Sequence, residues 1–592
     1  MKLKGYSGDA KTLLAFNLGK SEAKELAGFT IHCQPKGRDG YYLYNRLTYK
    51  HPERHAQVAT EPARSSVNSP FHKFRWLHVP GVIHQGQRPF FGQYTYTVTP
   101  RYFNGSGIML PIDPKLGRAI NVEVAPFRRK GMKVAFTRGF TQSQAFVERF
   151  GPTVRIRPKN AELLFDTNTE AGTSPAGTPF TYADQYDWLG FTARDQVFEI
   201  LEEVEKNPKL RVDVFAYDLN EPDLMRRLLS LAKKGRIRII LDNAALHHGA
   251  KPPPEDDFET EFNKVCKQPA ALMRGKFGRY QHHKVFVVYR GDTPIKVLTG
   301  STNFSVTGLY VNSNHVLVFE DPEIASKYAE VFEATWDDGV SATKFRKRPL
   351  ATDTFKFNSE KTPPTSVTFA PHNAEVANAV LQEVVDRVEI ERKQHGSVLF
   401  AVMELGKSTG PVLPALRQVH MDPKVFTYGI SDTTEGVRLY EPRTTTGLLV
   451  TGKPAKSRLP PPFNQVPSLG LGHQIHHKFV VCGFEGNDPV VFCGSSNLAL
   501  GGEQQNGDNL LAIHDREVVA AFMIEAIALV DHFEFLNRKS AAPNGAPLSR
   551  AGTDTRSAAS AGWFLSTTDL WTKPYFDKTD LKCIDRELFA KA

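Results

Sequence analysis

The sequence predicts an all-β domain in residues 1–150, followed by two α/β repeats in residues 151–350 and 351–540. Three observations support this fold class. Short aromatic and β-branched segments fill the first part of the chain, alternation of strand and helix patterns begins near residue 151, and one set of polar residues recurs at identical spacing in both later halves.

The sequence pattern of the N-terminal part is typical of an antiparallel β-sandwich. Segments such as GFTIHC and GQYTYTVTPRYF alternate in polarity and are separated by Gly, Pro and polar turns. The pattern resembles an immunoglobulin or fibronectin type III module, and we therefore expect a sandwich here.

The two α/β repeats follow the same order of elements. In the first, DQVFEILEEVEK is typical of an amphipathic helix, and RVDVFAY and RIRIILDN are typical of buried strands. In the second, NAEVANAVLQEVVDRVE predicts a helix and SVLFAVMEL a strand. The stretch AGTSPAGTP at 171–179 has the composition of a flexible connector, and we expect residues 541–592 to form a flexible linker and a C-terminal clasp.

A repeated motif decides the functional prediction. Each repeat contains H-x-K, and a G-S-x-N sequence begins 18 residues after the histidine in both. The loops elsewhere differ in length between the repeats, so the motif region is under the tighter geometric constraint. The motif residues are His282, Lys284, Gly300, Ser301 and Asn303 in the first repeat and His476, Lys478, Gly494, Ser495 and Asn497 in the second.

These residue types suit the binding and cleavage of a phosphodiester. Residues i and i+2 of a strand share a face, so the histidine and lysine of each motif project together. A glycine turn after the next strand offers backbone N–H groups, a hydroxyl and an amide to an anion. Two such half-sites facing each other would place two imidazoles, two ammonium groups and two amides around one point.

The paired H-x-K and G-S-x-N motifs resemble the phospholipase D superfamily over residues 151–540. The resemblance implies a bilobal α/β fold with one shared active site, no metal in the chemistry and a phosphohistidine intermediate. It also implies that Lys284, Lys478, Asn303 and Asn497 bind the non-bridging phosphoryl oxygens. The aspartate that many members carry five residues after the lysine is replaced by Tyr289 and Gly483, as it is absent in members resembling tyrosyl-DNA phosphodiesterase.

Asn314 and Asp508 stand 11 residues beyond the motif asparagines and are expected to support the catalytic histidines, with Ser301 and Ser495 as further supporting residues. If each supports the histidine of its own half, a carboxylate would stabilise the imidazolium of His476 and an amide would leave His282 neutral. This predicts His282 as nucleophile and His476 as general acid, although the motifs also allow the reverse.

Composition restricts the remaining possibilities. The chain has 592 residues, mean hydropathy of −0.35 and no run near the roughly 20 apolar residues of a membrane span, so we expect a cytoplasmic protein. Five cysteines without CxxC spacing disfavour a disulfide framework and a cysteine zinc site. We expect no cofactor and no metal, since the repeat already accounts for His476 in the zinc-like HxxHH pattern that starts at His473. His247 is expected on a solvated loop.

The substrate stays open between three hypotheses. A phospholipid headgroup is slightly favoured, with possible peripheral membrane contact and no transmembrane segment. The net charge of +10 fits a nuclease or nucleic-acid end-processing enzyme equally well, although such a charge also occurs without any binding role. The third hypothesis is a catalytically silent phosphate-binding scaffold. Both half-sites lie in one chain, which predicts a monomer.

Overall fold

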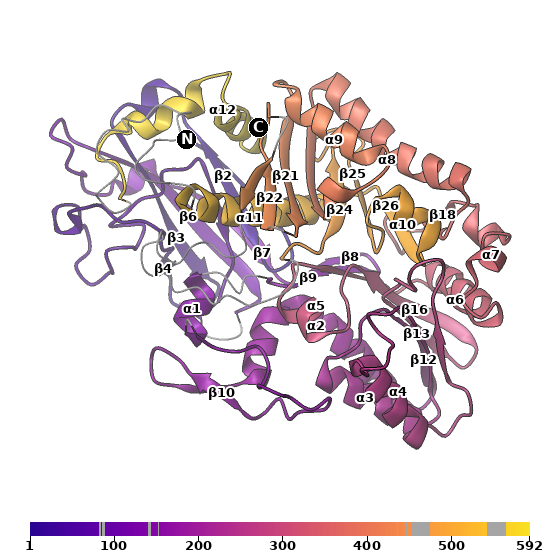
Figure 1. The fold of residues 1–592 in the computed structure, drawn as a ribbon. Coiled ribbons are helices and arrows are strands. Elements are labelled where there is room, and N and C mark those ends of the chain that lie inside the picture. Colours follow the sequence, from indigo (N-terminus) through magenta and orange to yellow (C-terminus); the bar gives the residue numbers. More distant parts are fainter. Residues whose placement is uncertain are drawn as a thin grey trace. The chain divides into compact units, whose positions relative to one another are not determined.

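The computed structural model describes residues 1–81, 84–85, 89–139, 144–151, 153–434, 436–444, 447–450, 474–540 and 564–591. The chain forms two compact units, one made of Met1–Pro126 with Arg538–Ala592 and the other of Phe127–Asn537 (Figure 1). His473 and the predicted linker at 541–562 lie outside the described residues.

The first unit contains two antiparallel sheets around one apolar core. Aromatic side chains from both sheets, including Phe16, Phe29 and Tyr96, belong to the same buried cluster. Immunoglobulin or fibronectin topology stays a prediction. One sheet has the order β1 (Lys2–Ser7), β2 (Thr12–Asn17), β5 (Arg75–His78), and the other β4 (Tyr41–Tyr42), β3 (Leu26–Pro35), β6 (Gly92–Tyr102), β7 (Arg118–Val124).

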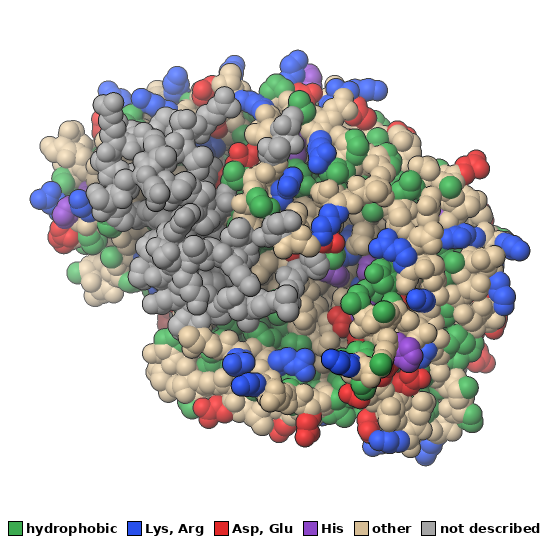
Figure 2. All heavy atoms as spheres, in the orientation of Figure 1, with side chains coloured by type: hydrophobic (Ala, Val, Ile, Leu, Met, Phe, Trp, Pro, Cys, Tyr) green, Lys and Arg blue, Asp and Glu red, His purple; other side chains and the backbone are tan. Residues whose placement is uncertain are grey.

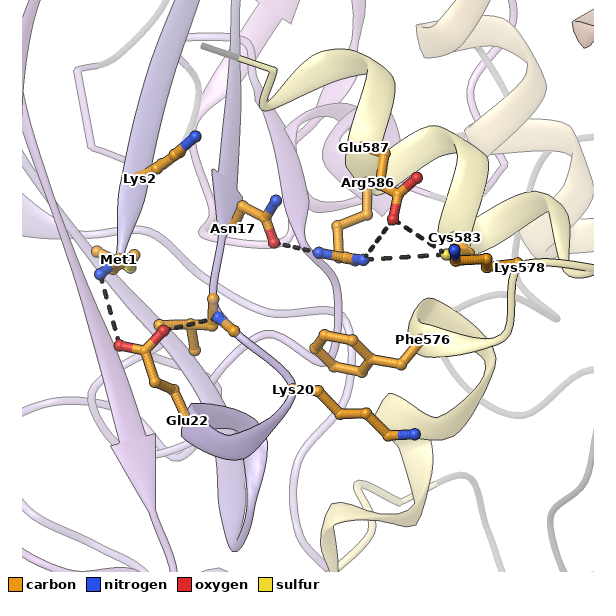
Figure 3. Close-up of a pocket in the computed structure, with 12 residues that line it drawn as sticks. Met1, Lys2, Asn17, Lys20, Glu22, Phe576, Lys578, Cys583, Arg586 and Glu587 are labelled. Atoms are coloured by element: carbon orange, nitrogen blue, oxygen red, sulfur yellow. Dashed lines mark hydrogen bonds and ion pairs between the residues drawn. The ribbon is translucent and has the colours of Figure 1, made fainter.

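Within this first unit, the C-terminal segment packs against the N-terminal strands. A 3₁₀ segment (Asp569–Phe576) contributes Trp571, whose indole N–H donates to the Leu26 carbonyl at 3.0 Å. Helix α12 (Leu581–Phe589) contributes Asp585, which forms a buried ion pair with Arg75 at 2.9 Å. Between this segment and the N-terminal strands lies a cavity of about 540 Å³ with lysines along its lining (Figure 3).

The boundary between the units differs from the prediction at residue 150. Strands β8 (Phe127–Arg129) and β9 (Met132–Phe136) join the sheet of the first repeat, where β9 pairs with β17 (His315–Phe319). The predicted flexible connector at 171–179 is also wrong, because β10 (Glu170–Thr173) and β11 (Pro179–Thr181) form an antiparallel hairpin.

The first repeat is built on an eight-stranded mixed sheet. β12 pairs in parallel with β13, which pairs in parallel with β14, and the motif strands β15 and β16 continue the sheet in antiparallel fashion. The order is β14 (Leu272–Gly275), β13 (Ile237–Asp242), β12 (Leu210–Ala216), β15 (Val285–Arg290), β16 (Thr293–Gly300), β17, β9, β8. Its helices are α2 (Tyr182–Lys206), α3 (Pro222–Lys233), α4 (Pro254–Val265), α5 (Val306–Tyr310), α6 (Pro322–Asp337) and α7 (Ala342–Phe345).

The second repeat has a nine-stranded sheet whose central strands follow the same order. β21, β20, β24, β25 and β26 correspond to β13, β12, β15, β16 and β17. The order is β18 (Phe355–Phe357), β19 (Thr365–Ala370), β26 (Asp508–Ile513), β25 (Val490–Gly494), β24 (Lys478–Cys482), β20 (Ser397–Met403), β21 (Phe426–Thr433), β22 (Gly436–Tyr440), β23 (Leu448–Val450). Its helices are α8 (Ala374–Gln394), α9 (Val412–Met421), α10 (Leu500–Gln505) and α11 (Arg516–Ser540).

On the face visible in Figure 2, charged side chains do not gather into one patch. In Figure 2, Lys and Arg side chains are scattered among acidic and neutral ones on the visible face. Across the described residues, no helix is both long enough and apolar enough to span a bilayer.

Candidate active site

Both H-x-K motifs stand at the start of a buried central strand. His282 and Lys284 immediately precede β15, and His476 precedes β24, which begins at Lys478. All four side chains are buried in the described structure. The pleat turns the intervening His283 and His477 away from the motif partners, toward Asn509 and His315 respectively.

The glycine of each G-S-x-N motif ends the following strand in a conformation that favours glycine. Gly300 has φ of 138° and Gly494 has φ of 141°. A Cβ at either position would also meet the backbone oxygen of the neighbouring strand, that of His315 or Asn509. The turn therefore requires glycine, which explains why glycine occupies the first position of the G-S-x-N motif.

The two repeats are joined at their motifs by backbone hydrogen bonds. The His282 N–H donates to the Gly507 carbonyl at 3.0 Å, and the His476 N–H donates to the Ser313 carbonyl at 3.1 Å. In each case the first residue belongs to one repeat and the second to the other. The start of each motif strand is thus positioned by a loop of the opposite repeat.

The predicted pairing of supporting residues and histidines is wrong, because each residue supports the histidine of the other half. His282 Nδ1 lies 2.7 Å from Asp508 Oδ1, and His476 Nδ1 lies 2.8 Å from Asn314 Oδ1. Asn314 and Asp508 do lie in the site, as their spacing indicated, and both are fully buried. The crossed backbone bonds bring each loop to the opposite histidine.

Hydrogen bonds fix the orientation of the Asn314 amide. Ser301 Oγ donates to Asn314 Oδ1 at 2.8 Å, and Asn314 Nδ2 donates to the Gly308 carbonyl at 2.8 Å. The oxygen therefore faces His476, whose Nδ1 also lies 3.1 Å from the Ser301 carbonyl. Since both neighbours are acceptors, Nδ1 carries a proton, and Nε2 is the nitrogen that can exchange a proton with a substrate.

The carboxylate of Asp508 fixes the tautomer of His282. Burial alone raises the pKa of Asp508, but the charges of His282 and Lys284 and hydrogen bonds from His282 and Ser495 hold this pKa below its ordinary value. An ionised carboxylate only accepts, so Nδ1–H of His282 donates to it and Nε2 has a free lone pair. Burial lowers the pKa of His282 to about 4, against the opposing effect of Asp508, which leaves the ring neutral at physiological pH.

The lysines concentrate positive charge that is poorly solvated. Lys284 Nζ donates to the His282 carbonyl, and Lys478 Nζ donates to the His476 carbonyl at 2.7 Å. Burial lowers the pKa of Lys284 to about 7, and burial with repulsion from Lys284 holds the pKa of Lys478 well below its ordinary value. Such a pair favours an anion placed between the two ammonium groups.

The motif asparagines have unused hydrogen-bonding capacity. Asn303 Oδ1 and Asn497 Oδ1 are buried without a hydrogen-bond partner among the described residues. Asn303 Nδ2 lies 3.4 Å from Asp218 Oδ2, a long contact that a ligand oxygen could replace. Unpaired buried polar atoms are costly, so they mark a place where a ligand or water completes the site.

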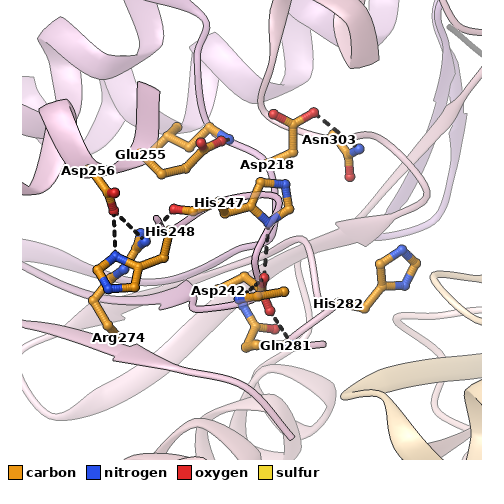
Figure 4. Close-up of polar contacts among 12 residues, drawn as sticks. Asp218, Asp242, His247, His248, Glu255, Asp256, Arg274, Gln281, His282 and Asn303 are labelled. Atoms are coloured by element: carbon orange, nitrogen blue, oxygen red, sulfur yellow. Dashed lines mark hydrogen bonds and ion pairs between the residues drawn. The ribbon is translucent and has the colours of Figure 1, made fainter. Parts of the chain in front are cut away.

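Sequence reasoning missed part of the surroundings. His247 was expected to be solvated but is buried, and its Nδ1 lies 2.9 Å from Asp242 Oδ2 (Figure 4). Asp242 Oδ1 also accepts the Gln281 N–H at 2.6 Å, directly before His282. In the second repeat Asp432 accepts the Gln474 N–H. The available signal was an aspartate at the end of the corresponding strand of each repeat, Asp242 in β13 and Asp432 in β21.

One group of side chains has the chemistry of metal ligands. Ligand atoms of Asp218, His247 and Glu255 lie within 4.8 Å of one another. His247 is already held by a hydrogen bond to Asp242, and Glu255 already accepts a hydrogen bond from the Leu219 N–H. We assign no metal to this group.

Comparison with known proteins agrees with this geometry for the first repeat. Residues 203–336 match the family model described as "Cardiolipin synthase, PLD-like domain". These residues are therefore similar to a phospholipase D-like domain.

The curated relatives are similar over the same part of the chain. Mitochondrial cardiolipin hydrolase from Xenopus laevis is 29% identical over 133 residues, which cover 22% of this chain and 57% of that protein. The protein of the same name from Chlamydomonas reinhardtii is 26% identical over 127 residues, 21% of this chain and 51% of that protein. The chain thus spans about half the length of these relatives.

Two solved structures have partial similarity to this chain. Phosphatidylserine synthase from Haemophilus influenzae has a TM-score of 0.38 and 12% identity, covering 58% of this chain and 84% of that one. The phospholipase D family member Nuc from Salmonella typhimurium has a TM-score of 0.19 and 21% identity, covering 24% of this chain and 86% of that one.

Proposed function

We propose that this protein is a phosphodiesterase that works through a phosphohistidine intermediate and needs no metal ion. The observation that carries the proposal is the crossed pair of hydrogen bonds, His282 with Asp508 and His476 with Asn314, which joins two imidazoles from different repeats into one site. Positive charge comes from Lys284 and Lys478, and the motif asparagines supply hydrogen-bond donors. In other enzymes, metal ions stabilise the phosphoryl group instead.

In the first step, Nε2 of His282 attacks phosphorus and forms an N–P bond. The bond from phosphorus to the leaving oxygen breaks, and His476 donates its Nε2 proton to that oxygen. In the second step, the now neutral His476 removes a proton from water. The water oxygen bonds to phosphorus while the N–P bond breaks, which restores His282 and protonated His476.

The assignment of roles follows from charge in the transition state. If a carboxylate partner marked the general acid, His282 would be the acid, because its partner is Asp508. The opposite assignment is electrostatically better. Attack gives the imidazole of His282 positive charge, which the adjacent carboxylate stabilises, whereas His476 must lose positive charge and is better served by the neutral amide of Asn314.

We propose a phospholipid diester of the cardiolipin type as substrate, reached by peripheral contact with a membrane from the cytoplasm. The support comes from the names of the relatives, mitochondrial cardiolipin hydrolase, and of the matching family model. A nucleic-acid diester is the second candidate, favoured by the net charge of +10. Since both half-sites belong to one compact unit, we further propose that the monomer is active.

The test is turnover in EDTA of cardiolipin-containing vesicles, single-stranded DNA and bis-p-nitrophenyl phosphate. The wild type is compared with His282→Ala, His476→Ala and His514→Ala, the last being an exposed histidine outside the site. The proposal predicts cleavage that both motif variants abolish and the control retains, and the substrate cleaved decides between lipid and nucleic acid. Cleavage that survives both motif substitutions would refute the mechanism, and no cleavage of any substrate would favour a silent phosphate-binding scaffold.

A further inference from the structure

A carboxylate lies beside one of the two motif asparagines. Asp218 Oδ2 is 3.4 Å from Asn303 Nδ2 (Figure 4). Asp218 Oδ1 accepts a hydrogen bond from Asn220 Nδ2 at 3.1 Å. Asp218 is half-buried, so water screens its charge incompletely. A negative charge is thus held next to an amide that we assign to a phosphoryl oxygen.

The backbone around Asp218 is anchored to the segment that carries Asn303. The Leu219 N–H donates to the buried Glu255 carboxylate at 2.9 Å. The next two N–H groups, of Asn220 and Glu221, both donate to the Phe304 carbonyl at 3.3 Å. These bonds keep Asp218 beside Asn303 and oppose its withdrawal when a ligand binds.

A neighbouring carboxyl group responds to the negative charge of Asp218. Glu255 lies within the same group of ligand atoms as Asp218 and His247. Burial, and then the charge of Asp218, raise the pKa of Glu255 to about 7. Further negative charge brought to this side is therefore opposed by the groups already present.

The second repeat lacks this arrangement. Glu404 stands after β20 at the position that corresponds to Asp218 after β12. The residue before each contacts the motif lysine of its own repeat. Met403 Sδ lies 3.6 Å from Lys478 Nζ, and the centre of the Tyr217 ring lies 4.8 Å from Lys284 Nζ. Glu404 instead forms an ion pair with Lys407 at 2.8 Å. Within the described part of the chain, no hydrogen bond joins Glu404 to Asn497.

We infer that Asp218 is a specificity-determining residue that selects phosphoryl groups carrying one negative charge over those carrying two. A diester has a single ionised oxygen, which the two lysines can hold away from Asp218. A monoester or inorganic phosphate carries a second charge on a further oxygen, and binding at Asn303 brings this charge close to the carboxylate. The inference rests on the proposed function in assuming that Asn303 binds phosphoryl oxygen.

The test measures binding rather than turnover, so its failure is distinguishable from failure of the proposed hydrolysis. Isothermal titration at about pH 7 compares dimethyl phosphate with methyl phosphate, a monoester. A monoester with a second pKa near 6 is mostly dianionic at this pH, and Lys284 remains partly charged. We expect Asp218→Asn to raise the affinity for methyl phosphate relative to dimethyl phosphate by at least about tenfold. Asp218→Glu, which keeps the charge, and Glu404→Gln, the matched change in the second repeat, should retain the wild-type ratio.

Three results would overturn the inference. An unchanged ratio in Asp218→Asn would show that the charge does not discriminate. Equal weakening of both ligands in that variant would assign Asp218 a structural role only. A wild type that binds neither anion would remove the phosphate site itself.

Discussion

His282 of the first repeat and Asp508 of the second are joined by a hydrogen bond of 2.7 Å between Nδ1 and Oδ1. Both side chains are buried. The imidazole is therefore oriented, with its Nε2 available for attack, by a residue 226 positions away in the chain. Neither repeat can complete this arrangement alone, since His476 depends in the same way on Asn314.

Replacing Asp508 by Asn should lower kcat by about 10- to 100-fold with a small change in KM. The amide can still accept from Nδ1–H, but it no longer stabilises the positive charge that His282 gains on attack, and supporting residues of this type typically contribute such factors. Steady-state kinetics on bis-p-nitrophenyl phosphate measure the effect. Asp488→Asn, an exposed hairpin aspartate, is the matched control and should behave as wild type. Equal kcat in Asp508→Asn and wild type would rule out this role.

The pH dependence of kcat/KM should show an alkaline limb near pH 7 from Lys284. Burial lowers its pKa to about 7, so the ammonium of the free enzyme is charged below this pH and neutral above it. Because the charged form binds phosphate, kcat/KM should fall as the pH rises through 7. Lys284→Arg keeps its charge to much higher pH and should move this limb upward. A limb that stays in place in the variant belongs to another group.

The acid limb of the same profile should lie near pH 4. Burial lowers the pKa of His282 to about 4, and the nucleophile must be neutral, so activity is lost only as the pH falls through that value. In Asp508→Asn the limb should move to still lower pH, because the carboxylate is the neighbour that raises the pKa of His282. A shift toward higher pH would contradict the assignment of His282 as the neutral nucleophile.

Asp585→Ala should destabilise the first unit by about 3 kcal/mol, since removal of one partner leaves the buried Arg75 charge without its carboxylate. The two side chains are 8% and 9% exposed, so solvent compensates little. Thermal unfolding followed by circular dichroism measures the loss, and limited proteolysis should cut the C-terminal segment faster. Glu587→Ala, whose side chain is 58% exposed, is the control on the same helix. Equal stability of the two variants would show that the ion pair contributes little.

The sequence was sufficient for the motif residues but not for their pairing. Equal spacing predicted both histidine sets, and the position 11 residues after each asparagine indicated Asn314 and Asp508. Which histidine each of them supports could not be inferred, because the crossed pairing depends on contacts between loops of opposite repeats. These contacts are the β-bridges of Gln281 with Gly507 and of Ser313 with Ile475. Nothing in a linear spacing distinguishes a loop that folds onto its own repeat from one that crosses to the other.

The unit boundary was missed for a related reason. Strand β9, MKVAF, has the same alternation of polar and apolar residues as the strands before it. Only its pairing with β17 assigns it to the first repeat. Asp242 and His247 were undervalued because burial and hydrogen bonding decide their role, and neither is visible in residue type. Core strands such as β15 and β24 were predictable because a short, continuous run of β-branched and aromatic residues is typical of a strand buried on both faces.

The most direct test of this mechanism is detection of the covalent intermediate. The enzyme is mixed with bis-p-nitrophenyl phosphate, quenched within milliseconds at alkaline pH, digested and analysed by mass spectrometry for a phosphoryl adduct. We predict an adduct on His282 that is absent in His282→Ala. The adduct should be enriched in a His476→Ala variant, because p-nitrophenolate can leave without a proton whereas hydrolysis of the intermediate lacks its base, so turnover stops after the first step. An adduct on His476 would reverse the roles, and turnover with no adduct on either histidine would contradict the central claim.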